Sequence, residues 1–308
     1  MTRSPVNGII VINKPVHMTS ARVVASVKRI SNAEKAGHSG TLDPLADGVL
    51  ICCLNRATRL ARFLLHGNKR YEAVLKLGEE TDTQDSTGTV VSVGDPAKLS
   101  AEVISSVFER FAGMMEQVPP VYSALKHKGK PLYRHARQGK PVQKPPRQVN
   151  IYSVEILEIK TPYIRFDVTC SAGTYIRTLC ADIGTSLGCG AHLHALRRLE
   201  SSGFTLQQAL TLKQLEAYAL EGTLPRKVIA MADALKLMPD ITADADLISK
   251  IRHGRELVPG DLNLERILQQ NKASQPYLKI VDGGNNLMAV LEYQKTKNKL
   301  KYCCVFAN

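Results

Sequence analysis

A polar loop at residues 37–48 (GHSGTLDPLADG) holds the densest group of side chains that could do chemistry. Its glycines permit tight turns and the close approach of a ligand. Asp43 precedes Pro44, which favours extended backbone at Asp43 and stiffens the loop. A carboxylate held in this way suits a nucleophile or a general base. Asp and Gly are also common in surface turns, and the spacing alone favours that simpler interpretation.

The segment 119–148 is the second candidate for function. It holds eight Lys or Arg residues, two His and no acid, so it supplies +8 of the net charge of +13. Such an excess suggests a polyanionic partner, although a solvated basic surface would show the same composition. Three prolines near its end argue against a regular packed element. Tyr122, Leu125, Leu132 and Tyr133 favour a partly ordered, projecting insertion over a disordered linker.

The elements that would position the loop follow from apolar periodicity. Residues 8–13 and 48–54 are typical of buried strands, and Thr19 and Ser20 offer an N-cap to a helix between them. We therefore expect the loop to join a helix to a strand. An amphipathic helix is marked by Ala57, Leu60, Phe63 and Leu64, and strands are expected at 70–77, 89–93 and 164–170. Further helices are expected at 99–111, with the stripe Val103, Val107 and Phe111, at 176–187, closed by Gly188, and at 212–221.

The tail of the chain differs from the rest. Residues 235–245 have the composition of a linker, and residues 240–308 mix one helix with short strand-like runs. With 308 residues, 44% apolar and 22% charged, the chain is long enough for two domains and a core without disulfides or a structural metal. The seven cysteines lack zinc-site spacing and are expected to be buried thiols. No signal-peptide or membrane-span pattern is seen, so we expect a cytoplasmic protein with no membrane partner.

Five segments resemble, in order, the motifs of the TruB family of pseudouridine synthases. The loop GHSGTLDPLADG resembles the active-site motif GHxGxLDPxAxG of that family. The other four segments are INKPVHMTS, KRYEAVLKLGEETDTQDSTG, PPVYSALKHKGKPLYRHARQG and CSAGTYIRTLCADIGTSLGCGAHLHALRRL. The resemblance covers roughly residues 8–210, and the tail is similar only in outline to an RNA-binding PUA domain.

The resemblance implies both a fold and an activity. The implied fold class is α+β, with a catalytic domain at 1–238 built on a mixed, mainly antiparallel sheet, an RNA-gripping insertion at 119–148 and a small β-rich PUA-like domain at 239–308. The implied enzyme is an isomerase that converts uridine to pseudouridine at position 55 in the T-loop of tRNA, with the target base flipped out. No atoms are gained or lost, so no cofactor is implied. The partner is the T-arm of tRNA, and we expect a monomer that needs no protein partner.

The resemblance also assigns the site residues. Asp43 would be the nucleophile, attacking C6 of uracil or C1′ of ribose, and the sequence leaves both routes open. Arg177 would be its cationic partner, binding the carboxylate bidentately, because a desolvated carboxylate needs a nearby cation to stay charged. Tyr71 would stack on the flipped uracil, and Tyr175 would be a second pocket tyrosine that transfers a proton.

Several further residues have roles that the resemblance leaves open. Lys14 would contact RNA or brace the pocket. His38 would fill or border the space that the flipped base leaves, or hydrogen-bond within the loop. Asp47, Asp82 and Asp85 are interpreted as bystander carboxylates. Asp47 stands where the family usually has a small or neutral residue, so we expect it to face solvent.

Two other functions fit part of the pattern. A non-catalytic RNA-binding protein would share the charge and the insertion, but it would not need Asp43, Tyr71, Tyr175 and Arg177 together. A nucleoside hydrolase with a glycosyl-enzyme intermediate would need a second carboxylate in an equally clear motif. None is found, and the isomerase is the favoured interpretation of the sequence.

Overall fold

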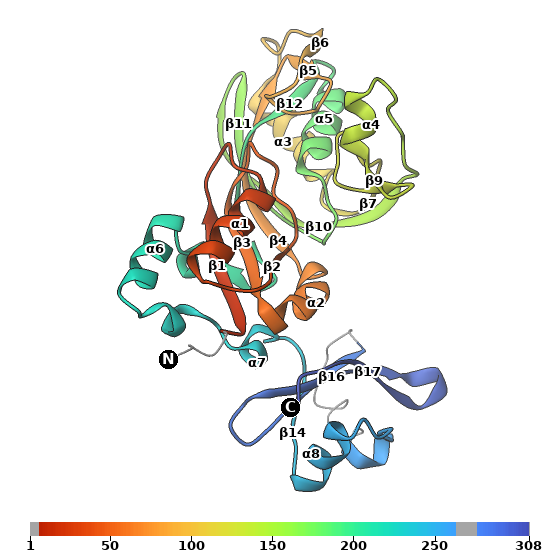
Figure 1. Cartoon of the computed structure of the whole chain (residues 1–308). Helices are drawn as coiled ribbons and strands as arrows, with labels where there is room; N and C mark the ends of the chain where they lie inside the picture. Colours follow the sequence, from red (N-terminus) through yellow and green to blue (C-terminus); the bar gives the residue numbers. More distant parts are fainter. Residues whose placement is uncertain (1–5, 263–275, 308) are drawn as a thin grey trace.

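A nine-stranded sheet forms the larger part of the molecule in the computed structural model, which describes residues 6–262 and 276–307 (Figure 1). Its main path runs β1 (Gly8–Lys14), β3 (Asp47–Leu54), β12 (Ala191–Ser201), β4 (Lys69–Leu77), β11 (Tyr163–Cys170), β10 (Arg147–Lys160) and β7 (Gly113–Gln117). β2 (Ala36–Ser39) pairs with β3, and β13 (Phe204–Thr205) pairs with β12. Among the strand pairings described for this sheet, β3–β12 alone is parallel, which confirms the predicted α+β class with a mixed, mainly antiparallel sheet.

Two helices pack on the half of the sheet that contains β4, β10, β11 and β12. α3 (Ala101–Glu109) contacts β10, and α5 (Ile176–Leu187) contacts β12. The alternation predicted for β11 is confirmed, because Ile164, Phe166, Val168 and Cys170 are all fully buried. α5 ends, as predicted, at Gly188, whose φ of 77° is the left-handed conformation that glycine adopts without strain.

The other half of the sheet has its own helices. α1 (Ser20–Ile30) and α6 (Leu212–Leu220) pack together beside β1, and Ile10, Ile12, Val23 and Val27 are fully buried between them. Thr19 caps α1, as predicted, by accepting a hydrogen bond from Arg22 N. A 3₁₀ turn, η1 (Asn55–Leu60), and the short helix α2 (Ala61–Leu65) follow β3, where the sequence predicted one continuous helix.

Three predictions about local structure are wrong. The first residues of the 37–48 loop belong to β2, so the loop joins two strands. In α3 the predicted stripe is wrong at Val103, which is 48% exposed, whereas Val107 and, just beyond the helix, Phe111 are buried as predicted. Ile104 and Phe108 complete the buried face. Residues 235–245 are no linker, since Leu235, Met238 and Ala243 are buried.

The basic insertion contains regular structure. β8 (Lys126–His127) and β9 (Lys130–Pro131) form a hairpin that leads into α4 (Leu132–Arg137). Leu132 is fully buried and its N–H donates to Leu125 O at 2.7 Å. The segment is therefore ordered, and its last two residues, Arg147 and Gln148, belong to β10. It lies to one side of the large sheet, away from α6 (Figure 1).

A four-stranded sheet forms the C-terminal part. Its order is β14 (Asp240–Thr242), β15 (Tyr277–Val281), β16 (Leu287–Gln294) and β17 (Lys299–Val305), with α8 (Ala245–Arg252) packed on β16. The remaining elements are β5 (Glu79–Thr81), β6 (Val90–Val93), η2 (Leu206–Gln208), η3 (Leu224–Lys227), α7 (Met231–Ala234), η4 (Pro259–Leu262) and η5 (Lys295–Lys297). Parts of both predicted domains, residues 1–5, 263–275 and 308, lie outside the described residues.

The two parts of the chain share an apolar core. Val290, Cys304 and Phe306 of the small sheet cluster with Leu60 and Leu64, at the lower end of the large one. All seven cysteines are unpaired thiols, and all except the half-buried Cys303 are buried. Within the described ranges, no helix is both long and apolar enough to cross a membrane.

Candidate active site

The turn that carries Asp43 is fixed by contacts from α1 and the residues before it. Ser20 Oγ, at the start of α1, accepts from Leu42 N and donates to Leu42 O, both at 2.9 Å. The N–H of His17 donates to Pro44 O at 2.7 Å. These bonds fix the backbone on both sides of Asp43.

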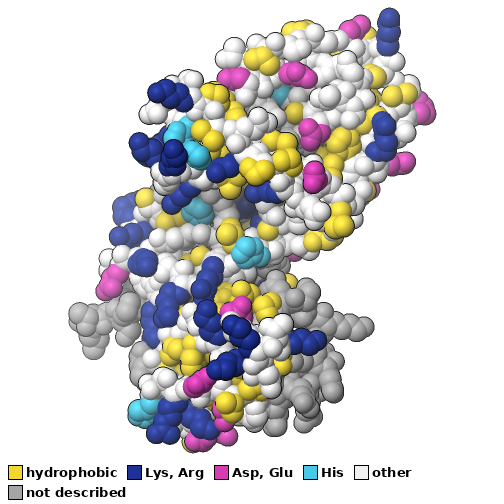
Figure 2. All heavy atoms as spheres, turned by 90° about the vertical axis from the view of Figure 1, so that its right-hand side faces the viewer, with side chains coloured by type: hydrophobic (Ala, Val, Ile, Leu, Met, Phe, Trp, Pro, Cys, Tyr) yellow, Lys and Arg dark blue, Asp and Glu magenta, His cyan; other side chains and the backbone are white. Residues whose placement is uncertain are grey.

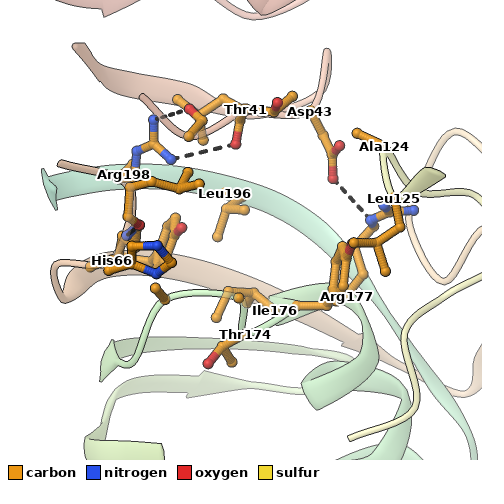
Figure 3. A pocket seen from close by; sticks show the side chains of 18 of the residues that line it. Thr41, Asp43, His66, Ala124, Leu125, Thr174, Ile176, Arg177, Leu196 and Arg198 are labelled. Carbon is orange, nitrogen blue, oxygen red and sulfur yellow. Dashed lines mark hydrogen bonds and ion pairs between the residues drawn. The ribbon is translucent and has the colours of Figure 1, made fainter. Parts of the chain in front are cut away.

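A buried arginine, Arg198, holds the turn from the sheet side. It is 1% exposed, and its Nε donates to Val49 O at 2.7 Å while Nη2 donates to Gly40 O at 3.1 Å (Figure 3). Its backbone pairs with Gly48, and a Cβ on Gly48 would collide with Arg198 O. Gly48 therefore permits the close crossing of β3 and β12 that aims Arg198 at the loop. The sequence analysis did not predict this role, although an arginine inside a strand-like segment is a signal of a buried, hydrogen-bonded cation.

Asp43 and Arg177 form an ion pair, with Arg177 Nε 3.0 Å from Asp43 Oδ2 (Figure 3). The contact uses one nitrogen rather than the two expected. Arg177 is 5% exposed at its side chain, whereas Asp43 is 38% exposed. The guanidinium also donates to Thr83 O and Tyr122 O, both at 2.9 Å. It is therefore fixed from several directions, while the carboxylate remains accessible to a ligand.

Asp85 is a second carboxylate at Arg177, which sequence reasoning interpreted as a bystander. Its Oδ2 lies 3.5 Å from Arg177 Nη1, and its side chain is 6% exposed. Asp85 Oδ1 accepts from Thr83 Oγ1 at 2.8 Å and from Thr87 N at 3.0 Å. These bonds orient Asp85 toward the guanidinium, so the loop that follows β5 fixes the contact between Asp85 and Arg177.

The expectation that Asp47 faces solvent is wrong. Its side chain is 18% exposed and pairs with Arg197, whose Nη2 lies 2.7 Å from Asp47 Oδ2. Arg197 Nε also donates to both carboxylate oxygens at 3.1 Å. The acid is explained by this cross-strand partner, since Asp47 and Arg197 are paired positions of β3 and β12. Asp82, by contrast, serves a local turn, accepting from Thr89 N at 2.8 Å.

A cavity of about 540 Å³ opens beside Asp43. Tyr71, Tyr175 and Arg177 line it together with Leu196 and the tip of the basic insertion, represented by Leu125 (Figure 3). Tyr71 is 7% exposed, and burial raises the pKa of its hydroxyl. Four of the six residues predicted for the site, Asp43, Tyr71, Tyr175 and Arg177, are thus brought to one cavity from three separate regions of the chain.

Tyr175 is held at the start of α5 by two residues from neighbouring strands. Its N–H donates to Gln117 Oε1 at 2.7 Å, and its carbonyl accepts from Gln117 Nε2 at 3.0 Å. The guanidinium of Arg147 lies 4.7 Å from the centre of its ring and donates to Gly173 O. Tyr175 has extended backbone as the N-cap residue, which lets its side chain and that of Arg177 reach the same cavity.

The other two predicted residues lie behind the loop. Lys14 is fully buried, and its Nζ donates to Pro15 O at 2.8 Å and Met18 O at 2.7 Å. Burial lowers the pKa of this ammonium to about 8, partly offset by the charges of Asp47 and Asp43. His38 lies on β2 and is not among the residues that line the cavity, whereas His66 is. Lys14 therefore braces the turn that contacts Pro44.

Two family models match consecutive parts of the chain. Residues 28–176 match the TruB family pseudouridylate synthase (N terminal domain), and residues 177–236 match the tRNA pseudouridylate synthase B C-terminal domain. The boundary between them falls at Arg177, so the Asp43–Arg177 pair joins the two matched regions.

Curated relatives and solved structures agree with these matches. The tRNA pseudouridine synthase B of Syntrophotalea carbinolica is 46% identical over 80% of this chain and 81% of its own. That of Syntrophus aciditrophicus is 40% identical over 96% of this chain and 93% of its own. The crystal structure of the archaeal box H/ACA sRNP Nop10-Cbf5 complex superposes with a TM-score of 0.73 at 27% identity, over 98% of this chain and 88% of that one.

Proposed function

The chain belongs to the TruB family and is a tRNA pseudouridine synthase, an isomerase, and from this premise we propose that it modifies the uridine at position 55 of the T-loop with Asp43 as its nucleophile. The single observation that carries the assignment of Asp43 is its ion pair with Arg177 at the edge of the cavity. Of the carboxylates in the sequence motifs, Asp43 combines an accessible side chain with a place in the cavity wall.

Pseudouridine formation requires a change of the glycosidic bond, a nucleophile that adds reversibly, and access of the base to the cavity. The bond from N1 of uracil to C1′ breaks, the base turns, and a bond from C5 to C1′ forms, while C5 loses a proton and N1 gains one. Asp43 would add to C6 or C1′ and leave again at the end, so the carboxylate is regenerated. A base inside a stacked loop cannot reach the cavity, and the target nucleotide must therefore be flipped out.

Two tyrosines are suited to the remaining tasks. Tyr71 is buried in the wall of the cavity, where its ring would stack on the extruded uracil. Tyr175 would carry the proton between C5 and solvent or N1. Its ring is held by Arg147 and its backbone by Gln117, so the hydroxyl would have a defined position in the cavity.

The two flanking regions would hold the RNA. Many Lys and Arg side chains lie on the face shown in Figure 2, along one side of the upper part and over the lower part, with several histidine side chains among them. The basic insertion at 119–148 carries eight Lys or Arg residues, and its Leu125 also lines the cavity. We assign the insertion and the PUA-like region at 239–308 to RNA binding, and residues 1–238 to catalysis. Phosphate contacts of this kind supply affinity rather than site selection.

The test is tritium release from tRNA labelled at uridine C5. Wild-type enzyme is expected to release the label from position 55, and Asp43→Asn to release none while its tRNA Kd stays within a few-fold. The isosteric amide keeps the shape of the side chain and removes its nucleophilic charge. Release by Asp43→Asn in a preparation free of wild-type enzyme would disprove the nucleophile assignment. Release from another position of the tRNA would disprove the target.

A further inference from the structure

A second, smaller cavity lies where α2 meets the C-terminal sheet. Its volume is about 200 Å³, and its walls come from the end of α2 and from β15, β16 and β17. His66, just after α2, lines both this cavity and the one that contains Asp43. A strand of RNA with one nucleotide in the first cavity would therefore have the second within immediate reach.

The cations at this cavity come from both parts of the chain. Arg62 lies on α2 and Lys301 on β17. Arg62 donates one hydrogen bond to Cys303 O, at 2.7 Å, and its guanidinium lies 4.7 Å from the centre of the Phe63 ring. Further N–H groups of the guanidinium remain available to a ligand. Lys301 has no ion-pair partner among the described residues. The two cations are suited to a phosphate group.

Two tyrosines provide fixed aromatic walls. The ring of Tyr277 packs edge to face against Phe63, with 5.2 Å between the ring centres. The hydroxyl of Tyr302 donates to Arg255 O at 3.1 Å. Both rings are half-buried and line the cavity. Aromatic rings held in this way are the usual partners of unstacked nucleobases in RNA-binding proteins.

Glu292 gives the cavity chemical selectivity. It lies opposite Lys301 in the β16–β17 ladder, is half-buried, and has neither a side-chain hydrogen bond nor an ion pair within the described ranges. A carboxylate accepts hydrogen bonds from the amino groups of cytosine, adenine or guanine. Uracil has a carbonyl oxygen at the corresponding position and would face Glu292 with an acceptor.

We propose that this cavity is a second nucleotide site, which holds an unpaired cytidine or purine nucleotide of the tRNA next to the target uridine. Arg62 and Lys301 bind its phosphate, Tyr277 and Tyr302 contact its base, and Glu292 accepts from its amino group. The proposal rests on the proposed function, because the neighbouring cavity must receive the target. Its role is selection and binding of the substrate, separate from the chemistry at Asp43.

Lys301→Ala tests the phosphate contact, with Lys299→Ala as the matched control. Lys299 is an exposed lysine two residues away on the same strand, outside the cavity, with Glu256 at 3.6 Å. With full-length protein and a T-arm stem–loop RNA, Lys301→Ala is expected to reduce the slope of log Kd against log salt by about one, and Lys299→Ala to leave it unchanged. Equal slopes for both variants would overturn the assignment.

Glu292→Leu tests base recognition. Each cytidine and purine of the T-loop is replaced in turn by uridine, and Kd is measured for wild type and variant. At one position the wild type is expected to lose about fivefold or more in affinity relative to Glu292→Leu. If no position shows this difference between wild type and Glu292→Leu, the proposal is overturned. It is also overturned if Glu292→Leu abolishes tight binding of free cytidine or adenosine monophosphate but changes the response of Kd to none of the RNA substitutions.

These binding experiments do not depend on isomerisation. Single-turnover tritium release at saturating enzyme is expected to keep the wild-type rate in the control Lys299→Ala, since Lys299 lines neither cavity. A wild-type protein that binds the T-arm with the predicted coupling but releases no label would contradict the proposed function alone. Normal release without coupling would contradict the second nucleotide site alone.

Discussion

At the scale of single residues, Tyr71 has two separable properties, the face of its ring and its hydroxyl. Tyr71→Phe keeps the ring, and Tyr71→Leu keeps only apolar bulk. If stacking is its role, Phe retains substantial activity and Leu loses about 1–3 kcal/mol of binding or transition-state stabilisation. Single-turnover rates at saturating enzyme measure this without product release. Equal inactivity of both variants would make the hydroxyl essential, and full activity of both would remove Tyr71 from the site.

Lys14 connects burial to a measurable pH dependence. Its pKa is about 8 in the folded protein and 10.5 without burial, so above pH 10.5 it is neutral in both states, and below pH 8 it is charged in both. The unfolded state binds more protons between these values, and stability from this group rises with pH across the window. We expect the free energy of urea unfolding of wild type to increase relative to Lys14→Met from pH 8 to 10.5. A constant difference across the window would contradict the burial of the ammonium.

The residues that sequence reasoning found and missed differ in how local their signals are. Asp43 stands in a dense motif, and Tyr175 and Arg177 stand two positions apart in another. Arg198 acts on Gly40 from 158 positions away, and Asp85 acts on Arg177 across a loop. In neither case does the local sequence identify the partner, because each role depends on strands and loops that meet only in the folded chain. Asp47 was misassigned for the same reason, since its partner Arg197 is 150 positions distant.

At the scale of elements, apolar periodicity correctly predicted the strands and helices that bury one face. β11 and α5 have one buried face each, and their boundaries and buried residues agreed with the sequence. β2 is a four-residue strand with three half-buried positions, so it has no apolar alternation to detect. In α3, Val103 was one of several apolar residues available for the buried stripe, and only packing against the sheet decides between them.

The basic insertion makes a prediction at this scale. Replacing Lys126, Lys128, Lys130, Arg134 and Arg137 by glutamine should flatten the salt dependence of tRNA binding, because fewer counterions are released when fewer phosphates are neutralised. Arg147 is left in place because it packs on Tyr175. The measurement is Kd from low to moderate salt. Glutamine at Lys213 and Arg226, exposed on the α6 side, serves as the control and should change the slope little. An unchanged slope in the five-residue variant would show that the insertion does not grip the RNA.

At the scale of the whole molecule, the small sheet is joined to the large one by a specific contact surface. Arg59 Nη1 donates to Val305 O at 2.7 Å, and Arg56 donates to Phe306 O. Both guanidiniums lie over the ring of Phe306, at 5.0 Å for Arg59 and 5.7 Å for Arg56. Lys279 Nζ, on β15, donates to Ala232 O at 2.9 Å, before the boundary predicted at residue 238. Polar and apolar contacts thus continue across that boundary.

This continuity predicts that the two parts unfold as one unit. Phe306 is 4% exposed in the core shared with Leu60 and Leu64, and Phe306→Ala should cost about 3 kcal/mol or more of the free energy of unfolding. Leu278 is a matched control, because it is 2% exposed in a core that belongs to the small sheet alone. In urea unfolding followed by circular dichroism, both variants should shift one common transition if the shared core couples the sheets. Two transitions, with the larger unmoved in Phe306→Ala, would show instead that the large sheet is stable without the small one. Coupling would also mean that the wall of the second cavity is positioned by the same contacts that stabilise the fold, since Arg62 and Cys303 belong to this junction.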